Sequence, residues 1–382
     1  MKTRLLIFFT LIFALGCKEE ILLDSVQNKK ALVVDGFITN EPGPYRIRLT
    51  YTSNANQPEI LPVTGCEVII DDNTGNTEIL IEKEPGNYYT SESGIIGIIG
   101  NQYKLSIKTP EGKEYITEFQ EMKAAVGIDS IYAKTEFIPN IDFPYGIPGY
   151  MFYLDTKPTN EQQNYFLWGM TETYKYDIDY ELGYIIDKYG DQITNTLAFD
   201  TIETCWKTES VKYISTGTTA NLTNNQLFNK QLYFVSTETK KLTKRYSVLV
   251  KQYTIDKQAF QYWDEVRKQI TNENILTTSQ PYNVNSNIFN TSDNEEKILG
   301  YFTVASVVEK RIFVDQLREP FYFNKTVVIT DQRTISDYKR VHKPPYYYVK
   351  IENESYGLLA DPACLDCRNE GGTLNKPDFW ID

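Results

Sequence analysis

Short runs in which apolar and polar side chains alternate recur along this 382-residue chain. One is Tyr45-Arg46-Ile47-Arg48-Leu49, and others span residues 103–107 and 173–180. A period of two places successive side chains on opposite faces of an extended backbone, so each run predicts a half-buried antiparallel strand. The 29 tyrosines fit this interpretation, because aromatic residues favour pleated sheets. We therefore expect a mainly β fold.

Turn residues divide the β-rich sequence into two regions. In residues 31–120, strand-like runs are separated by turns at 42–44, 71–75, 85–86 and 110–113, which predicts an immunoglobulin-like or transthyretin-like β-sandwich. Residues 121–382 are expected to form a larger β-rich domain that ends in a cysteine-containing tail. It should hold one packed helix near 256–271, with Thr254 or Asp256 as its N-cap. The predicted apolar stripe of this helix is Phe260, Trp263, Val266 and Ile270.

The first sixteen residues are organised like an export signal. Lys2 and Arg4 precede an apolar run over residues 5–15, which is too short to span a bilayer as a helix. Gly16 then precedes Cys17, as in a bacterial lipobox. We expect cleavage after residue 16 and a diacylglyceryl or palmitate lipid on Cys17. The alternative is an ordinary signal peptide that leaves Cys17 as a free thiol.

Residues 17–30 are expected to form a lipidated tether. Its first charged residues, Lys18, Glu19 and Glu20, resemble the surface-export tag of Bacteroidetes lipoproteins. They also suit a plain solvated tether, because charged side chains cost little to expose. The tag predicts a protein anchored by lipid in the outer membrane and facing the cell exterior.

The remaining cysteines are Cys66, Cys205, Cys364 and Cys367, in a compartment where disulfides are permitted. The Cys364-x-x-Cys367 pair suits a redox motif, half a zinc site or a structural bridge. We favour a structural disulfide, either within the pair or from one of its members to Cys205. Cys66 fits a buried small residue.

Composition argues against most site chemistry. The formal net charge of −12 gives no basic surface for phosphates, so nucleic acid is not expected as a partner. His342 is the only histidine, which removes Ser-His-Asp, Cys-His and multi-histidine metal sites. Acid pairs for glycoside hydrolysis are numerous, but no local signature marks one. We expect no catalytic residues, metal or cofactor, and no enzymatic activity.

A family resemblance is carried by segments distributed in order along nearly the whole chain after residue 30. They are residues 32–40 (LVVDGFITN), 43–45 (GPY), 85–89 (PGNYY), 128–132 (IDSIY), 205–207 (CWK), 246–253 (YSVLVKQY), 299–302 (LGYF), 364–368 (CLDCR), 371–373 (GGT) and 376–380 (KPDFW). These segments resemble a family of Bacteroidetes outer-membrane lipoproteins known as a domain of unknown function (DUF4249). The resemblance also favours a bridge from Cys205 to Cys364 or Cys367, because Cys66 lies outside the shared segments.

Members of that family are often encoded beside TonB-dependent outer-membrane receptors. The resemblance therefore implies an accessory lipoprotein that docks on a TonB-dependent β-barrel and helps to capture or deliver an unknown solute or glycan. One alternative is a structural or assembly subunit of an outer-membrane complex. Another is a stand-alone adhesin that binds glycans or peptides, for which tyrosine is well suited because it offers a large ring and a hydroxyl group.

Overall fold

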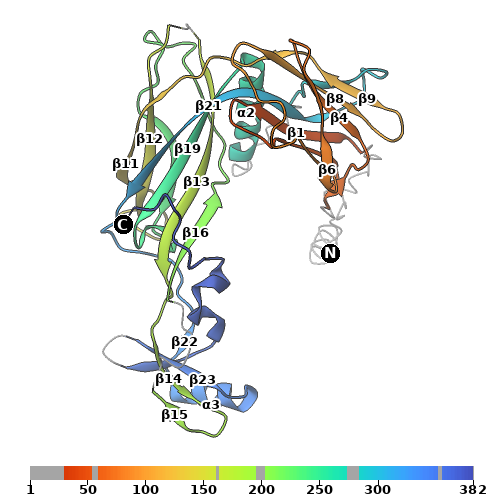
Figure 1. Cartoon of the computed structure of the whole chain (residues 1–382). Coiled ribbons are helices and arrows are strands. Elements are labelled where there is room, and N and C mark those ends of the chain that lie inside the picture. Colours follow the sequence, from red (N-terminus) through yellow and green to blue (C-terminus); the bar gives the residue numbers. More distant parts are fainter. Residues whose placement is uncertain are drawn as a thin grey trace, which may run out of the picture.

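The computed structural model describes residues 30–53, 59–160, 163–194, 203–272, 284–351 and 355–381. The expected signal peptide and most of the tether, with Cys17, Lys18, Glu19 and Glu20, lie outside these ranges. The prediction of a mainly β chain is confirmed (Figure 1). Among the described residues, no helix has the length and apolar character needed to cross a membrane.

Two sheets pack face to face in the N-terminal part and form a β-sandwich. Val34 and Ile47 on one sheet share a buried core with Val68 and Leu105 on the other. One sheet contains β1 (Leu32–Thr39), β2 (Arg46–Tyr51), β3 (Leu61–Pro62), β6 (Ile81–Glu84) and β7 (Asn87–Tyr89). The other contains β4 (Glu67–Asp72), β5 (Thr77–Ile79), β8 (Gln102–Lys108), β9 (Glu114–Thr117), β10 (Gln120–Glu121) and β20 (Ile288–Asn290).

A single long strand, β21 (Leu299–Val314), links this sandwich to the rest of the molecule (Figure 1). Its first half pairs in parallel with β1, from Val33 opposite Leu299 to Thr39 opposite Ala305. Its second half, from Ser306 onward, pairs antiparallel with β19. In addition, β20 pairs with β9. Two strands that follow residue 284 therefore complete the sheets formed by residues 31–120.

The second part is also built from two facing layers. One layer is β11 (Ile128–Ile138), β12 (Ile147–Thr156) and β18 (Lys230–Ser236). The other is β13 (Tyr165–Asp177), β16 (Thr204–Ser210), β17 (Ser215–Thr218), β19 (Tyr246–Ile255) and the second half of β21. Phe152 and Leu232 of the first layer share a core with Trp168 and Val248 of the second.

Helix α2 (Lys257–Asn272) lies within one residue of the predicted range at each end. Asp256 begins it, because its Oδ1 accepts a hydrogen bond from the Ala259 amide at 2.7 Å. Phe260 and Trp263 pack on the sheet as predicted, since their rings lie 5.3 Å from Tyr165 and 5.7 Å from Phe37. The prediction of the apolar stripe is wrong at its last residue, because Ile270 is exposed.

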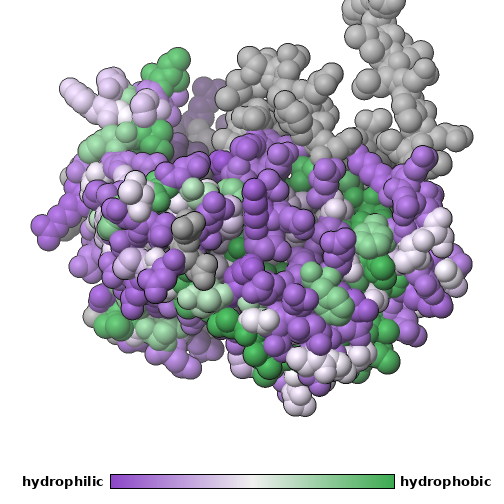
Figure 2. Space-filling view, turned by 90° about the horizontal axis from the view of Figure 1, so that it is seen from above, coloured by the Kyte–Doolittle hydropathy of each residue, from purple (hydrophilic) through white to green (hydrophobic). Residues whose placement is uncertain are grey.

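A small lobe projects from the second part (Figure 1). Its sheet contains β14 (Leu182–Ile186), β15 (Gln192–Ile193), β22 (Val328–Ile329), β23 (Tyr346–Lys350) and β24 (Tyr356–Leu359), and α3 (Gln332–Val341) packs on it. The described residues also form short 3-10 helices at η2 (Lys240–Leu242), η4 (Pro362–Leu365) and η5 (Cys367–Glu370). Helix α3 was not predicted, because only Ile335 on it is buried and the apolar periodicity is short. Seen from above, the surface is mostly hydrophilic with small apolar groups (Figure 2).

Candidate binding groove

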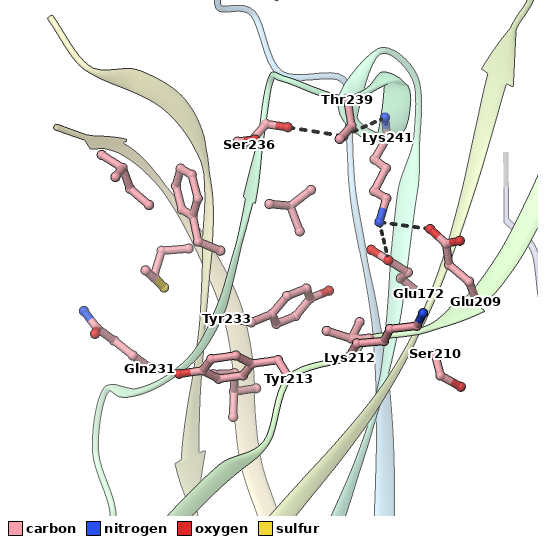
Figure 3. A pocket seen from close by; sticks show the side chains of 16 residues that line it. Glu172, Glu209, Ser210, Lys212, Tyr213, Gln231, Tyr233, Ser236, Thr239 and Lys241 are labelled. Carbon is pink, nitrogen blue, oxygen red and sulfur yellow. Dashed lines mark hydrogen bonds and ion pairs between the residues drawn. The ribbon is translucent and has the colours of Figure 1, made fainter. Parts of the chain in front are cut away.

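A bulge in the strand beside β13 builds one wall of a groove. Thr171 of β13 pairs with Ser210 of β16, and Trp168 pairs with Ser215 of β17. Between these two pairs, β13 has only residues 169–170, whereas the opposite strand has residues 211–214. Two extra residues on the opposite strand must therefore loop out of the sheet. Such bulges redirect side chains and are common beside functional sites. Here the bulge brings Val211 to the groove. Lys212 and Tyr213 reach it as well (Figure 3).

Strand β18 forms the facing wall. It is the outermost strand of its sheet, since it pairs with β12 and the described residues add no further strand beside it. All residues from Gln231 to Ser236 line the groove. Ile138, Met151 and Thr239 also line the groove. The cavity holds about 700 Å³ and has more apolar than polar surface, which is the size and character of sites for small organic ligands.

An ion-pair network lies along the bulge side of the groove. Lys241 Nζ lies 2.5 Å from Glu172 Oε1 and 2.9 Å from Glu209 Oε1, and Lys207 lies 3.5 Å from Glu209. Only 5% of the Glu172 side chain is exposed, and the Tyr246 hydroxyl donates to it at 2.6 Å. Two lysines therefore balance two glutamates, and the network requires no charge from a ligand.

The protonation states of this network follow from the same contacts. Burial alone would lower the pKa of Lys241, but its hydrogen bonds to Glu172 and Glu209 outweigh burial and raise that pKa. Burial would raise the pKa of Glu209, but Lys241 and Lys207 lower it. Burial raises the pKa of Tyr246 well above its ordinary value. The wall thus holds fixed charges on Lys241 and Glu209 and a neutral phenol at neutral pH.

Lys212 and Tyr213 at the mouth of the groove differ from this network. Both side chains are exposed, Tyr213 by 48%. Within the described part of the chain, neither residue makes a hydrogen bond or an ion pair. They are available to a ligand without breaking a contact within the protein.

The described cysteines do not line the groove. Cys205 and Cys367 form a disulfide with a Cα–Cα distance of 5.8 Å, which joins β16 to the tail. Cys364 and Cys66 are free. Burial raises the pKa of the Cys66 thiol, which favours its unreactive protonated form. The Trp206 and Thr373 main chains also pair, so the tail lies along β16.

His342 follows α3, and its ring stacks on Tyr338 with 3.9 Å between centroids. Among the described residues, no group of three His, Cys, Asp or Glu side chains is placed to hold a metal ion. The groove residues were not recognised from the sequence. Their one local signal is Val211-Lys212-Tyr213 immediately after a strand-like run, and its meaning depends on pairing with residues some forty positions earlier.

No curated protein sequence matches this chain. Among solved structures, the adhesin InvE of Yersinia pseudotuberculosis is similar over 59% of this chain and 55% of that chain, with 14% identity and a TM-score of 0.15. The family model described as "Domain of unknown function (DUF4249)" matches residues 18–311. The chain therefore belongs to the DUF4249 family.

Proposed function

We propose that this protein is a surface-exposed outer-membrane lipoprotein that captures a ligand in the groove between β16 and β18. The observation that carries the proposal is the bulge at residues 211–214, which opens the sandwich edge and places exposed groups at the mouth of an apolar cavity. Binding sites generally combine such an apolar cavity with a few polar groups that orient the ligand.

The anchor in this proposal is a lipid on Cys17, supported by the lipobox-like sequence. Replacing Cys17 with Ala is expected to move the protein from the membrane fraction to the soluble fraction. Intact-mass measurement of the wild type should show cleavage before Cys17 and the added mass of lipid. An unmodified wild-type Cys17 would contradict this part of the proposal.

The proposed partner is a TonB-dependent β-barrel, for which the protein acts as an accessory in solute uptake. The support is the gene neighbourhood typical of the family. The test is affinity purification of C-terminally tagged protein from gently solubilised outer membranes, with Cys17→Ala as the matched control. One stoichiometric TonB-dependent barrel, lost in the control, is the expected result. Recovery of the protein alone would contradict the partnership and favour a stand-alone adhesin.

A second candidate function, a structural or assembly subunit, is favoured by the tip of the β11–β12 hairpin. Ile141 is 99% exposed and Tyr145 is 91% exposed there. Exposed apolar side chains at a loop tip suit contact with another protein. Recovery of assembly machinery in the same purification, abolished by Ile141→Ser and Tyr145→Ser together, would establish this second function in place of solute capture.

A further inference from the structure

The shape of the groove identifies the kind of ligand it fits. Successive side chains of a strand point to opposite faces, so a cavity on one face touches every second residue. This cavity touches all residues from Gln231 to Ser236, and residues 209–213 on the other wall. It therefore runs along the edge of β18, where main-chain N–H and C=O groups are presented, and the end of β16 with its bulge faces that edge.

The chain itself covers the neighbouring stretches of these edges. Trp206 at the start of β16 exchanges main-chain hydrogen bonds with Thr373, at 2.9 and 2.8 Å. Just after β18, the Tyr322 amide donates to the Thr237 carbonyl at 2.9 Å. No comparable segment of the described residues covers β18 between Gln231 and Ser236. Uncovered edge strands are sites where another extended chain can pair.

We infer that the groove binds an extended peptide segment, which adds to β18 as an extra strand. This inference rests on the proposed function of the groove as a ligand site. Strand addition gains affinity from main-chain hydrogen bonds and specificity from pockets that take alternate side chains. The six lining residues of β18 extend over about 17 Å, which matches roughly six residues of bound peptide.

The side chains of the groove define the preferred sequence of the peptide. Val211, Met151 and Phe234 line the groove and keep part of their surface exposed, which favours apolar residues at the peptide positions that face them. Lys212 at the mouth has no ion-pair partner among the described residues, which favours an acidic residue near that end. Glu172 and Lys241 already neutralise each other, so they do not select for charge. The expected ligand is a peptide with alternating apolar and polar residues that carries an acidic group.

The probe is a pool of acetylated, amidated octapeptides in which apolar residues alternate with Thr or Asp. Binding to the whole protein is measured by affinity selection and then by calorimetry on the best peptide. Each peptide nitrogen is next methylated in turn, which removes one hydrogen-bond donor and leaves the side chains unchanged. Strand addition predicts that methylation at every second position weakens binding at least tenfold, whereas the positions between are tolerated.

Two groove variants and one control complete the experiment. Tyr213→Ala and Lys212→Glu should each weaken the best peptide at least fivefold. Tyr189→Ala, which removes a 78% exposed tyrosine from the separate lobe, should have no effect. These substitutions affect exposed side chains, so circular dichroism should show an unchanged fold.

Other results would overturn the inference. Some of them would leave the groove as a ligand site, and others would overturn the proposed site as well. Peptide binding with no alternation in the methylation series would show side-chain recognition without strand addition. Binding of maltohexaose, lost in Tyr213→Ala, with no peptide bound would show a glycan groove. Both results leave the groove as a ligand site. Peptide binding unaffected by either groove variant would overturn the inference and the proposed site together. Absence of any peptide binding would overturn the inference, and outer-membrane purification would then decide on the proposed function separately.

Discussion

At the scale of single residues, the groove wall depends on a nearly buried carboxylate. Glu172 sits mid-strand, and the lysine that neutralises it, Lys241, lies 69 positions further along the chain. Neither residue belongs to a local motif. An isolated buried charge is costly, so this pair has to form together when β13 and η2 meet.

Replacing Lys241 with Met is therefore expected to destabilise the protein by about 3 kcal/mol, because a buried charge loses its partner. Urea unfolding measures this loss. The control is Lys108→Met, whose pair with Glu114 has both side chains at least half exposed and should contribute less than about 1 kcal/mol. Equal effects of the two variants would show that burial of Glu172 does not govern this network.

At the scale of elements, several features were predictable from local sequence. The strands of residues 31–120 carry their own alternation and turns, and α2 carries its own cap at Asp256. The groove was not predictable in this way. Its bulge exists because residues 165–177 pair with both β16 and β17 at registers that leave unequal lengths between them. Register between strands that are distant in the sequence is not encoded in either strand alone.

Helix α2 gives a pH-dependent prediction. Thr216 of β17 donates to Asp264 Oδ1 at 2.8 Å, and Arg267 and Lys268 also contact this carboxylate. Burial would raise the pKa of Asp264, but the hydrogen bonds from Lys268, Arg267 and Thr216 lower it to about 2. The charged form therefore stabilises the folded state above the ordinary pKa of 3.8, and this stabilisation is lost as the pH falls towards about 2.

Asp264→Asn should thus lower the free energy of unfolding by about 2 kcal/mol at pH 7, and the gap to wild type should close between pH 4 and pH 2. Denaturant titrations across this range provide the measurement. Asp337→Asn is the control, because its pair with Arg340 is exposed on α3. A gap that stays constant down to pH 2 would show that the ionisation of Asp264 plays no part in anchoring α2.

At the scale of the whole molecule, β21 makes the two parts interdependent. The two-region organisation was inferred from residues 31–120 and 121–382, but residues 288–314 complete both sheets of the first region. Parallel pairing of strands some 265 positions apart cannot be recognised from local periodicity. In this pairing Gly300 of β21 lies opposite Val34 of β1.

Substitution of Gly300 tests whether β1 and β21 approach each other closely. Gly300 has φ +87°, and an added Cβ would lie 1.9 Å from the Val34 carbonyl oxygen of β1. Gly100 has a similar φ of +89° with nothing within 4 Å of an added Cβ. Its replacement therefore measures the free-energy cost of a positive φ without a steric clash. Gly100→Ala is expected to cost about 1 kcal/mol, and Gly300→Ala about 3 kcal/mol or more. Equal losses in thermal or urea unfolding would show that β1 and β21 do not approach closely.

We propose that the groove between β16 and β18 holds the ligand of a surface lipoprotein. The most direct measurement places a photoreactive benzophenone amino acid at position 213, and separately at position 189, in the full-length protein in living cells. If the groove holds the ligand, position 213 will form cross-links to a discrete peptide, glycan or barrel segment identified by mass spectrometry, and position 189 will form none to that species. Cross-links of equal yield from both positions, or from position 189 alone, would contradict it.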